Sequence, residues 1–277
     1  MKAALIQLCS GRDMARNIAD AAGLIREAAR QGAQFAATPE MTNILETDRD
    51  RLRGLVRAEH EDRSVQAFAE LARELRLWLL AGSFALKGAG AKLLNRSLLF
   101  SPDGQVAARY DKVHLFDVDL PDGQKLRESA AYAAGHPVPV LPLPFATIGL
   151  TICYDVRFPH LYRALAQAGA DVLTVPSAFT RITGEAHWHV LLQARAIETG
   201  SFILAPAQGG LHECGRETFG MSLAVSPWGD VIAEGGKEPQ LVMAEIDRSK
   251  AVEARRRIPV LEPGKPVILN AQGGVAT

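Results

Sequence analysis

The sequence predicts an α/β fold built as a four-layer α-β-β-α sandwich of two similar halves. Three observations lead to this prediction. Helix-like and strand-like stretches alternate along the chain, a pattern typical of helices layered on sheets. A strand-turn-strand segment occurs twice, at 98–106 and 223–231. Apolar residues make up 48% of the 277 positions, enough to bury a large core.

Two segments carry apolar residues at helical spacing, so we expect each to lay one face on a sheet. The residues are Ile18, Ile25 and Ala29 in the first segment and Val65, Phe68, Leu71, Ala72 and Leu75 in the second. Short apolar runs bounded by Pro, Gly or Asp predict strands. These runs are 2–8, 35–38, 78–84, 97–101, 146–153, 171–176, 202–206 and 222–226.

The repeated segment predicts internal symmetry. Each copy has a strand, a Ser-Pro-x-Gly turn and a returning strand. We interpret the copies as parts of two halves, each a sheet with outer helices, although chance similarity of common turn chemistry is the alternative. The stretch 117–144, rich in Pro, Gly and Ala, reads as the connection between them. No sharp boundary divides the chain, so 1–277 is expected to form a single domain.

Composition argues against several classes of function. Lys plus Arg and Asp plus Glu are equal at 31 each, and the basic residues are scattered, so no field favours nucleic acid. No apolar run approaches the roughly 18 residues that cross a bilayer. Three widely spaced cysteines, Cys9, Cys153 and Cys214, include no C-x-x-C pair, which favours free thiols and a cytoplasmic location.

Cys153 is a candidate nucleophile. It ends an apolar run and precedes a helix expected to begin near His160. A strand-to-helix elbow presents a side chain at the sheet edge, with backbone N–H groups close by to stabilise an oxyanion. The alternative is that Cys153 is a small buried hydrophobic residue.

Two charged residues stand in similar contexts. Glu40 comes just beyond the predicted strand 35–38, and Lys112 lies beside apolar neighbours after the first hairpin. Each could equally be a solvated loop residue, so neither indicates a site without the other.

Taken together, these segments resemble the nitrilase superfamily of carbon–nitrogen hydrolases, whose triad is Glu, Lys and Cys in that chain order. The matching motifs are Pro-Glu-Met at 39–41, Tyr-Asp-Lys-Val-His-Leu at 110–115 and Ile-Cys-Tyr-Asp-Val-Arg-Phe-Pro at 152–159. The resemblance extends from the first strand to about Pro259 and implies the same α-β-β-α sandwich. It also implies a second glutamate in the connecting loop, which maps onto Glu128.

The resemblance implies an amidase that forms a thioester on Cys153 and needs no metal or cofactor. Lys112 is expected to favour the thiolate, and Glu40 to act as general base. Lys112 and the backbone N–H of Tyr154 are expected to stabilise the oxyanion. Glu128 is expected to orient Lys112 and balance its charge.

A narrower resemblance, to the Nit branch, comes from Pro-Ser-Ala-Phe at 176–179, Thr-Gly at 183–184 and the segment 186–198. Within that branch, 114–118 and 205–208 are most similar to deaminated glutathione amidases. The ω-amidases acting on α-ketoglutaramate share most of these motifs, and another amide or carbamoyl substrate is a further alternative. Both named substrates are α-keto acids with a distal amide, so the expected partner is a small anionic amide.

An anionic substrate requires an anion contact, which we expect from Arg157 or Arg181 through a bidentate carboxylate pair. For Arg157 the alternative is a structural ion pair. Phe179, Thr180, His187 and Trp188 are expected to line the substrate pocket, although aromatic residues are as often part of the core.

The chain departs from its relatives at two places. Met221 follows Gly220 where the branch usually has His, and 259–265 lacks the usual Arg-Pro-Asp-Leu-Tyr ending. We expect the first to reshape the site wall and the second to alter subunit contacts. By resemblance alone, the protein is expected to form a homodimer or a larger homo-oligomer.

Two rival functions come from other classes. A metallohydrolase would use His187, His189, His212 and Cys214, but residues two apart on a helix point to different faces. A non-catalytic binding module would be expected to have a broken triad, whereas all three triad residues are present here.

Overall fold

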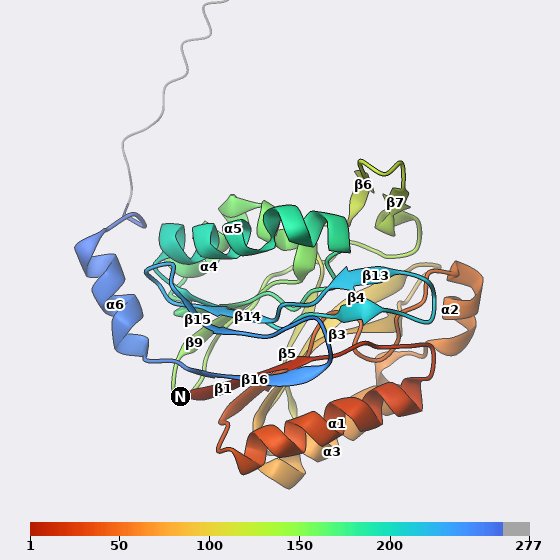
Figure 1. Ribbon diagram of the computed structural model, residues 1–277. Helices are drawn as coiled ribbons and strands as arrows, with labels where there is room; N and C mark the ends of the chain where they lie inside the picture. Colours follow the sequence, from red (N-terminus) through yellow and green to blue (C-terminus); the bar gives the residue numbers. More distant parts are fainter. Residues whose placement is uncertain (263–277) are drawn as a thin grey trace, which may run out of the picture.

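A computed structural model describes residues 1–262 of the chain. The end of the atypical tail segment 259–265 therefore lies outside the described residues, as does the last part of the predicted domain 1–277. The described part contains two six-stranded sheets with helices on their outer faces, as Figure 1 shows. The predicted α-β-β-α sandwich is confirmed.

The first sheet has the strand order β16-β1-β2-β3-β4-β5. Strands β1, β2 and β3 are parallel, whereas β16, β4 and β5 pair antiparallel with their neighbours. The strand bounds are β1 Lys2–Gln7, β2 Phe35–Ala37, β3 Trp78–Lys87, β4 Leu93–Phe100, β5 Val106–Asp111 and β16 Gln240–Glu245.

The second sheet has the order β15-β14-β11-β10-β9-β8. Strands β9, β10 and β11 are parallel, and β8, β14 and β15 pair antiparallel with their neighbours. The two sheets therefore repeat one pattern, which confirms the two-half interpretation. The strand bounds are β8 Val140–Pro142, β9 Thr147–Leu150, β10 Val172–Thr174, β11 Phe202–Ala205, β14 Leu223–Val225 and β15 Val231–Glu234.

The repeated Ser-Pro-x-Gly segments form matching hairpin turns. In the β4–β5 turn, Ser101 N donates to Gln105 O at 2.9 Å, and in the β14–β15 turn Ser226 N donates to Asp230 O at 2.8 Å. Gly104 and Gly229 both have positive φ, a conformation that a residue with a Cβ adopts only at a cost. The same turn sequence therefore gives the same hairpin turn before the edge strand of each sheet.

Helices cover the outer face of each sheet. Helices α1 (Met14–Arg30) and α3 (Arg63–Leu75) lie on the first sheet, and α4 (Pro159–Gln167) and α5 (Arg181–Thr199) lie on the second (Figure 1). The side chains of Asp13 and Asp62 accept backbone N–H groups at the starts of α1 and α3, which caps these helices. Shorter helices are α2 (Arg49–Leu55) and α6 (Arg248–Arg257).

The predicted buried face of α1 needs one correction. Its fully buried residues are Asn17, Ala21, Ile25 and Ala28, whereas Ile18 and Ala29 are only partly buried. Asn17 is buried because its amide donates to Gly11 O and Asn43 O, which a hydrophobicity pattern cannot anticipate. The face of α3 is as predicted, except that Leu75 is only partly buried.

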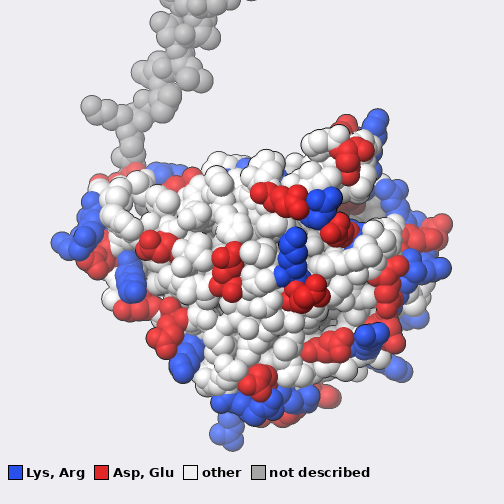
Figure 2. Space-filling model, in the orientation of Figure 1, with Lys and Arg blue, Asp and Glu red and all other residues white. Residues whose placement is uncertain are grey.

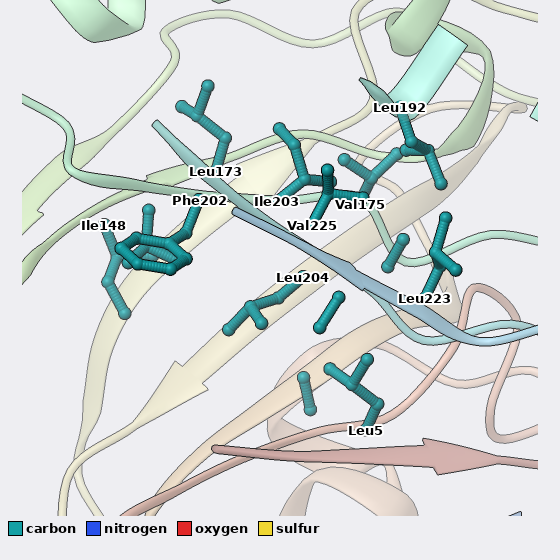
Figure 3. Close-up of a cluster of buried hydrophobic side chains, with 14 of the residues drawn as sticks. Leu5, Ile148, Leu173, Val175, Leu192, Phe202, Ile203, Leu204, Leu223 and Val225 are labelled. Carbon is teal, nitrogen blue, oxygen red and sulfur yellow. The ribbon is translucent and has the colours of Figure 1, made fainter. Parts of the chain in front are cut away.

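The main core lies between the two sheets. Figure 3 shows Leu5 of the first sheet facing Leu204 and Leu223 of the second. Along β1 the side chains alternate, so that Leu5 joins this inter-sheet core while Ala4 and Ile6 pack with residues of α1 and α3. Because both faces of the sheet are covered, its central strands read as continuous apolar runs.

The connection between the halves has structure of its own. It contains the hairpin β6 (Asp117–Asp119) and β7 (Lys125–Arg127), followed by the 3₁₀ helix η2 (Glu128–Ala130). Figure 1 shows this hairpin projecting above the end of the sandwich. A second hairpin, β12 (Gly209–Leu211) and β13 (Glu217–Phe219), lies between β11 and β14, and a further 3₁₀ helix is η1 (Glu59–Glu61).

One strand boundary matters for function. The predicted strand 146–153 ends at Leu150, and Cys153 instead opens a 3₁₀ helix, η3 (Cys153–Arg157). Among residues 1–262, no helix has both the length and the apolar character needed to span a membrane.

Candidate active site

The structure brings the four predicted catalytic side chains to one cavity of about 290 Å³. Glu40 follows β2, Lys112 follows β5, Cys153 follows β9 and Glu128 follows β7. Each thus stands where the chain leaves a strand, in a different part of the sequence.

Lys112 connects the two glutamates. Its Nζ donates to Glu40 Oε1 at 2.7 Å and to Glu128 Oε2 at 2.9 Å. The lysine side chain is 2% exposed, so these ion pairs are sheltered from water. An ammonium buried in this way is tolerable only because it is paired and hydrogen-bonded.

Asn95 completes this cluster, and sequence analysis did not identify it. Its Nδ2 donates to Glu40 Oε1 and to Glu128 Oε1, both at 2.9 Å, and its backbone O accepts from Lys112 N at 3.0 Å. Asn95 is buried in β4, within a run that otherwise reads as an ordinary strand. The only sequence signal was a polar amide in an apolar setting.

The surroundings of Glu40 favour its ionised form. Its Oε2 accepts from the backbone N of Ala178 at 2.9 Å, and its backbone O accepts from Gln208 Nε2 at 3.0 Å. Burial raises the pKa of Glu40, but the charge and hydrogen bond of Lys112 and the hydrogen bond from Asn95 outweigh it, so the pKa lies below its ordinary value. Conversely, burial lowers the pKa of Lys112, but Glu128 and Glu40 outweigh it and raise that pKa.

Cys153 stands at a tight elbow. Its φ is 50°, in the left-handed region, and its backbone N donates to Pro176 O at 2.9 Å. A non-glycine residue in this region is strained unless its surroundings hold it, and such residues cluster at functional sites. The elbow predicted from the sequence is therefore present.

Asp155 holds the elbow to the Lys112 segment. Its carboxylate accepts from Ile152 N at 2.8 Å and from Tyr110 Oη at 2.6 Å, and it lies 2.7 Å from His114 Nδ1. Asp155 is fully buried. One carboxylate thus links the strand end before the nucleophile to residues on both sides of Lys112.

The surroundings of Cys153 act on the pKa of its thiol in opposite directions. Burial raises the pKa of Cys153, the charge of Glu40 raises it further, and Lys112 opposes both only in part. The charge of Lys112 thus acts in the predicted direction, toward the thiolate, but burial and Glu40 outweigh it. Cys153 is thus a thiol close to an ionised carboxylate.

Four predicted substrate-binding residues lie elsewhere. Arg157 Nη2 is 3.3 Å from His187 Nδ1, and its guanidinium lies over the Phe179 ring, 5.5 Å from the ring centroid. The Phe179 and Trp188 ring centroids are 4.9 Å apart, and Trp188 Nε1 donates to Met221 O at 2.8 Å. None of the four is among the described residues that line the cavity. These side chains contact one another, and their part in substrate binding stays a prediction.

Thr180 and Arg181 line a neighbouring cavity of about 400 Å³. Thr180 caps α5, and Arg181 pairs with Glu217 at 2.8 Å and Glu185 at 3.2 Å. The two cavities share Thr47, Leu126 and Arg216 in their walls. Arg181 is therefore near the site but already bound to two carboxylates.

Met221, the first departure from the branch pattern, is part of this packing. It has a φ of 56°, and its backbone N donates to Gly236 O at 2.8 Å. Its backbone O accepts from Trp188, and Met221 is not among the described residues that line the cavity.

Sequence analysis also missed several cations of the cavity wall. They come from α2, β7 and the β12–β13 hairpin and are Arg49, Lys125, Arg127 and Arg216. Apolar residues, including Ile44, Leu52, Phe116 and Tyr132, line the rest of the cavity. No local motif marks these residues, because only the fold brings their segments together.

The donors of the alternative metal site have other neighbours. His189 Nε2 lies 2.6 Å from Glu234 Oε1, and His212 Nε2 lies 2.7 Å from Thr218 Oγ1. Within the described range 1–262, no three His, Cys, Asp or Glu side chains form a group that could hold a metal ion.

Comparison with known proteins supports the same chemistry. The carbon-nitrogen hydrolase family matches residues 2–256. The chain is 42% identical to a deaminated glutathione amidase of Synechocystis, over 94% of this chain and 96% of that protein. It is 35% identical to omega-amidase NIT2 of Bos taurus, over 93% and 92% of the two chains.

A solved structure agrees with the fold. The NitFhit protein of C. elegans superposes with a TM-score of 0.89 and 34% identity, covering 95% of this chain and 65% of that one. The chain thus spans about two thirds of that protein. With a family match over nearly its whole length, the chain belongs to the carbon–nitrogen hydrolase family and is an amide-hydrolysing enzyme.

Proposed function

We propose that this enzyme hydrolyses deaminated glutathione through a thioester on Cys153. The observation that carries the proposal is the grouping of a buried thiol with the Glu40–Lys112–Glu128 cluster in one cavity. A nucleophile, a base and a cation within one sheltered site are what acyl transfer requires.

In the first half-reaction, Glu40 takes the thiol proton while Sγ attacks the amide carbon. The carbonyl π electrons move to oxygen, where the Lys112 ammonium and the backbone N–H of Tyr154 stabilise the charge. The C–N bond then breaks, and protonated Glu40 gives its proton to the departing nitrogen. A thioester remains on Cys153.

In the second half-reaction, Glu40 takes a proton from water as the water oxygen attacks the thioester carbon. The C–S bond breaks, and the proton returns from Glu40 to the sulfur. Glu128 and Asn95 keep Lys112 and Glu40 in place throughout. The net reaction consumes one amide and one water and yields a carboxylic acid and an amine.

Charge in the cavity wall supports an anionic substrate. Five cationic side chains and three acidic ones line the cavity. Two of the acids, Glu40 and Glu128, are paired with Lys112, and the third, Glu46, lies 2.6 Å from Arg12 Nε. The remaining cations favour a ligand with carboxylates. Deaminated glutathione has one on its α-keto acyl part and another on its cysteinylglycine leaving group.

The test compares deaminated glutathione with α-ketoglutaramate, which share the acyl product α-ketoglutarate. Measuring this product for both gives kcat/KM on one scale. We expect a clear preference for deaminated glutathione, in line with 42% identity to such an amidase against 35% to an omega-amidase. Preference for α-ketoglutaramate would reassign the substrate, and turnover of neither would direct the search to other amides or carbamoyl compounds.

We further propose that the enzyme is a homodimer or a larger homo-oligomer of the cytoplasm. Exposed apolar residues on α5, the β14–β15 hairpin and α6 support an interface; they are Val190, Ile197, Trp228, Ile232 and Val252. Figure 2 shows broad uncharged areas between scattered acidic and basic residues on the visible face.

The three free cysteines favour a reducing compartment.

A further inference from the structure

Arg216 is a residue of the cavity wall whose hydrogen bonding is incomplete. It immediately precedes β13, where its backbone O accepts from His212 N at 2.9 Å and Gly215 forms the turn. The hairpin thus fixes the backbone of Arg216, from which the side chain extends. Its Nη2 donates to Ala178 O at 2.8 Å, but its Nε is buried without a hydrogen-bond partner in the described part of the chain.

A buried guanidinium N–H without a partner is costly, and native proteins rarely keep one without a reason. Three other cations nearby are already paired with carboxylates of the described residues. Lys112 binds two glutamates, Arg181 pairs with Glu185 and Glu217, and Arg127 pairs with Asp119. Arg216 has no ion pair with any carboxylate of residues 1–262, so its charge is available to a ligand.

The position of Arg216 relates it directly to the catalytic base. Ala178 accepts from Arg216 through its carbonyl and donates to Glu40 Oε2 at 2.9 Å through its backbone N. A single residue therefore separates the guanidinium from Glu40. Arg216 also lines both the catalytic cavity and its neighbour, so it stands at their junction.

We propose that Arg216 binds the α-keto carboxylate of the acyl part of the substrate, using Nε and an adjacent Nη as a two-pronged donor. This inference rests on the proposed function and specifies it. A carboxylate matches the fork geometry of a guanidinium and satisfies the buried Nε. The acyl chain is then held at both ends: its reacting carbonyl carbon lies at Cys153 and its α-keto carboxylate at Arg216.

The test uses Arg216→Gln, with Arg26→Gln as the matched control. Arg26 forms a two-pronged pair with Glu74 on the exposed surface, away from both cavities. For Arg216→Gln we expect kcat/KM to fall at least ~100-fold for both deaminated glutathione and α-ketoglutaramate, mainly through KM. The control variant should match wild type.

Two further readouts separate binding from structure. Alkylation of Cys153 by neutral iodoacetamide should proceed at the wild-type rate in Arg216→Gln, and its Tm should stay within a few degrees. Binding of α-ketoglutarate to Cys153→Ala, measured by calorimetry, should be lost when Arg216→Gln is added. Arg216→Lys should recover only part of the loss, because a lysine has the charge but not the fork.

The outcomes are distinct. If wild type turns over both substrates and Arg216→Gln keeps that activity, the inference is overturned while the proposed function stands. A loss confined to deaminated glutathione would also overturn it, because the carboxylate bound would then be that of the leaving group. Failure of the wild-type enzyme on both substrates, with unchanged α-ketoglutarate binding in the variant, would refute the substrate and the inference together.

Discussion

At the scale of single residues, the central feature is one ammonium shared by two carboxylates. Lys112 lies 2.7 Å from Glu40 and 2.9 Å from Glu128, and Asn95 donates to both glutamates. The cluster therefore has one positive and two negative charges beside Cys153. Burial and the charge of Glu40 raise the pKa of the Cys153 thiol, and Lys112 offsets them only in part.

The nucleophile assignment gives the first prediction. Cys153→Ser should fold normally and lose nearly all turnover, because a hydroxyl is a far weaker nucleophile than sulfur beside the same base. Cys9→Ser and Cys214→Ser serve as matched controls and should keep full activity. The measurement is kcat on the preferred amide together with Tm; substantial turnover by the Cys153 variant would refute the mechanism.

A second prediction concerns pH. The pKa of Glu40 is lowered, so its ionised form and the stability it contributes are present above its unfolded pKa and are lost only as pH falls through the still lower folded value. The pKa of Cys153 is raised, so no thiolate forms near neutrality. We expect kcat/KM and the rate of iodoacetamide alkylation to be flat from about pH 6 to pH 8. A rise in alkylation centred near an ordinary thiol pKa would contradict this.

At the scale of elements, the elbow at η3 depends on contacts outside itself. Its predicted location at a strand end was right, because an apolar run followed by Asp and Pro marks the end of a strand locally. The predicted strand was too long, however. After Leu150 the chain leaves the sheet and forms η3, where Asp155 contacts Tyr110 and His114. Contacts between segments so far apart in the chain cannot be predicted from a local sequence pattern.

The third prediction tests this link. Asp155→Asn keeps the size of the side chain but removes the charge that accepts from Ile152 N, Tyr110 Oη and the His114 segment. We expect kcat to fall ~10-fold to 100-fold, since small misplacements of a nucleophile are costly. The loss of buried hydrogen bonds should also lower stability by about 1 to 3 kcal/mol.

Asp62→Asn is a suitable control, because Asp62 caps α3 on the outer face of the first sheet. It should affect Tm without changing kcat at temperatures where the protein stays folded. Equal kinetic effects of the two variants would show that Asp155 supports the fold in general and not the elbow.

At the scale of the whole molecule, two similar sheets face each other across one core. The functional side chains gather where strands of both sheets end, so neither half could form the cavity alone. Helices cover the outer faces, but α5, α6 and the β14–β15 hairpin leave apolar side chains exposed, of which Val190 is 68% exposed.

The fourth prediction concerns assembly. Multi-angle light scattering of wild type should give at least twice the 29.9 kDa mass of the chain. Val190→Glu should shift the protein toward monomer, because a buried unpaired charge opposes association. Glu245→Gln, an exposed change at the end of β16, is the control and should keep the wild-type mass. A wild-type monomer at high concentration would refute the proposed oligomer.

The sequence by itself determined the elements and the chemistry. Periodicity placed α3 and the central strands, the repeated Ser-Pro-x-Gly turns indicated the two halves, and the three motifs pointed to Glu40, Lys112 and Cys153. These features depend on near neighbours in the chain, which a sequence displays directly.

Only the tertiary structure decided what surrounds these residues. Asn95 and Arg216 come from distant segments, and Arg157 and Trp188 contact Phe179 without being among the described residues that line the cavity. The direction of the thiol pKa likewise follows from burial and from the opposing charges of Glu40 and Lys112. The physical reason is that cavity walls, buried hydrogen bonds and local electrostatics arise from contacts between segments far apart in the chain. These contacts exist only after the chain has folded.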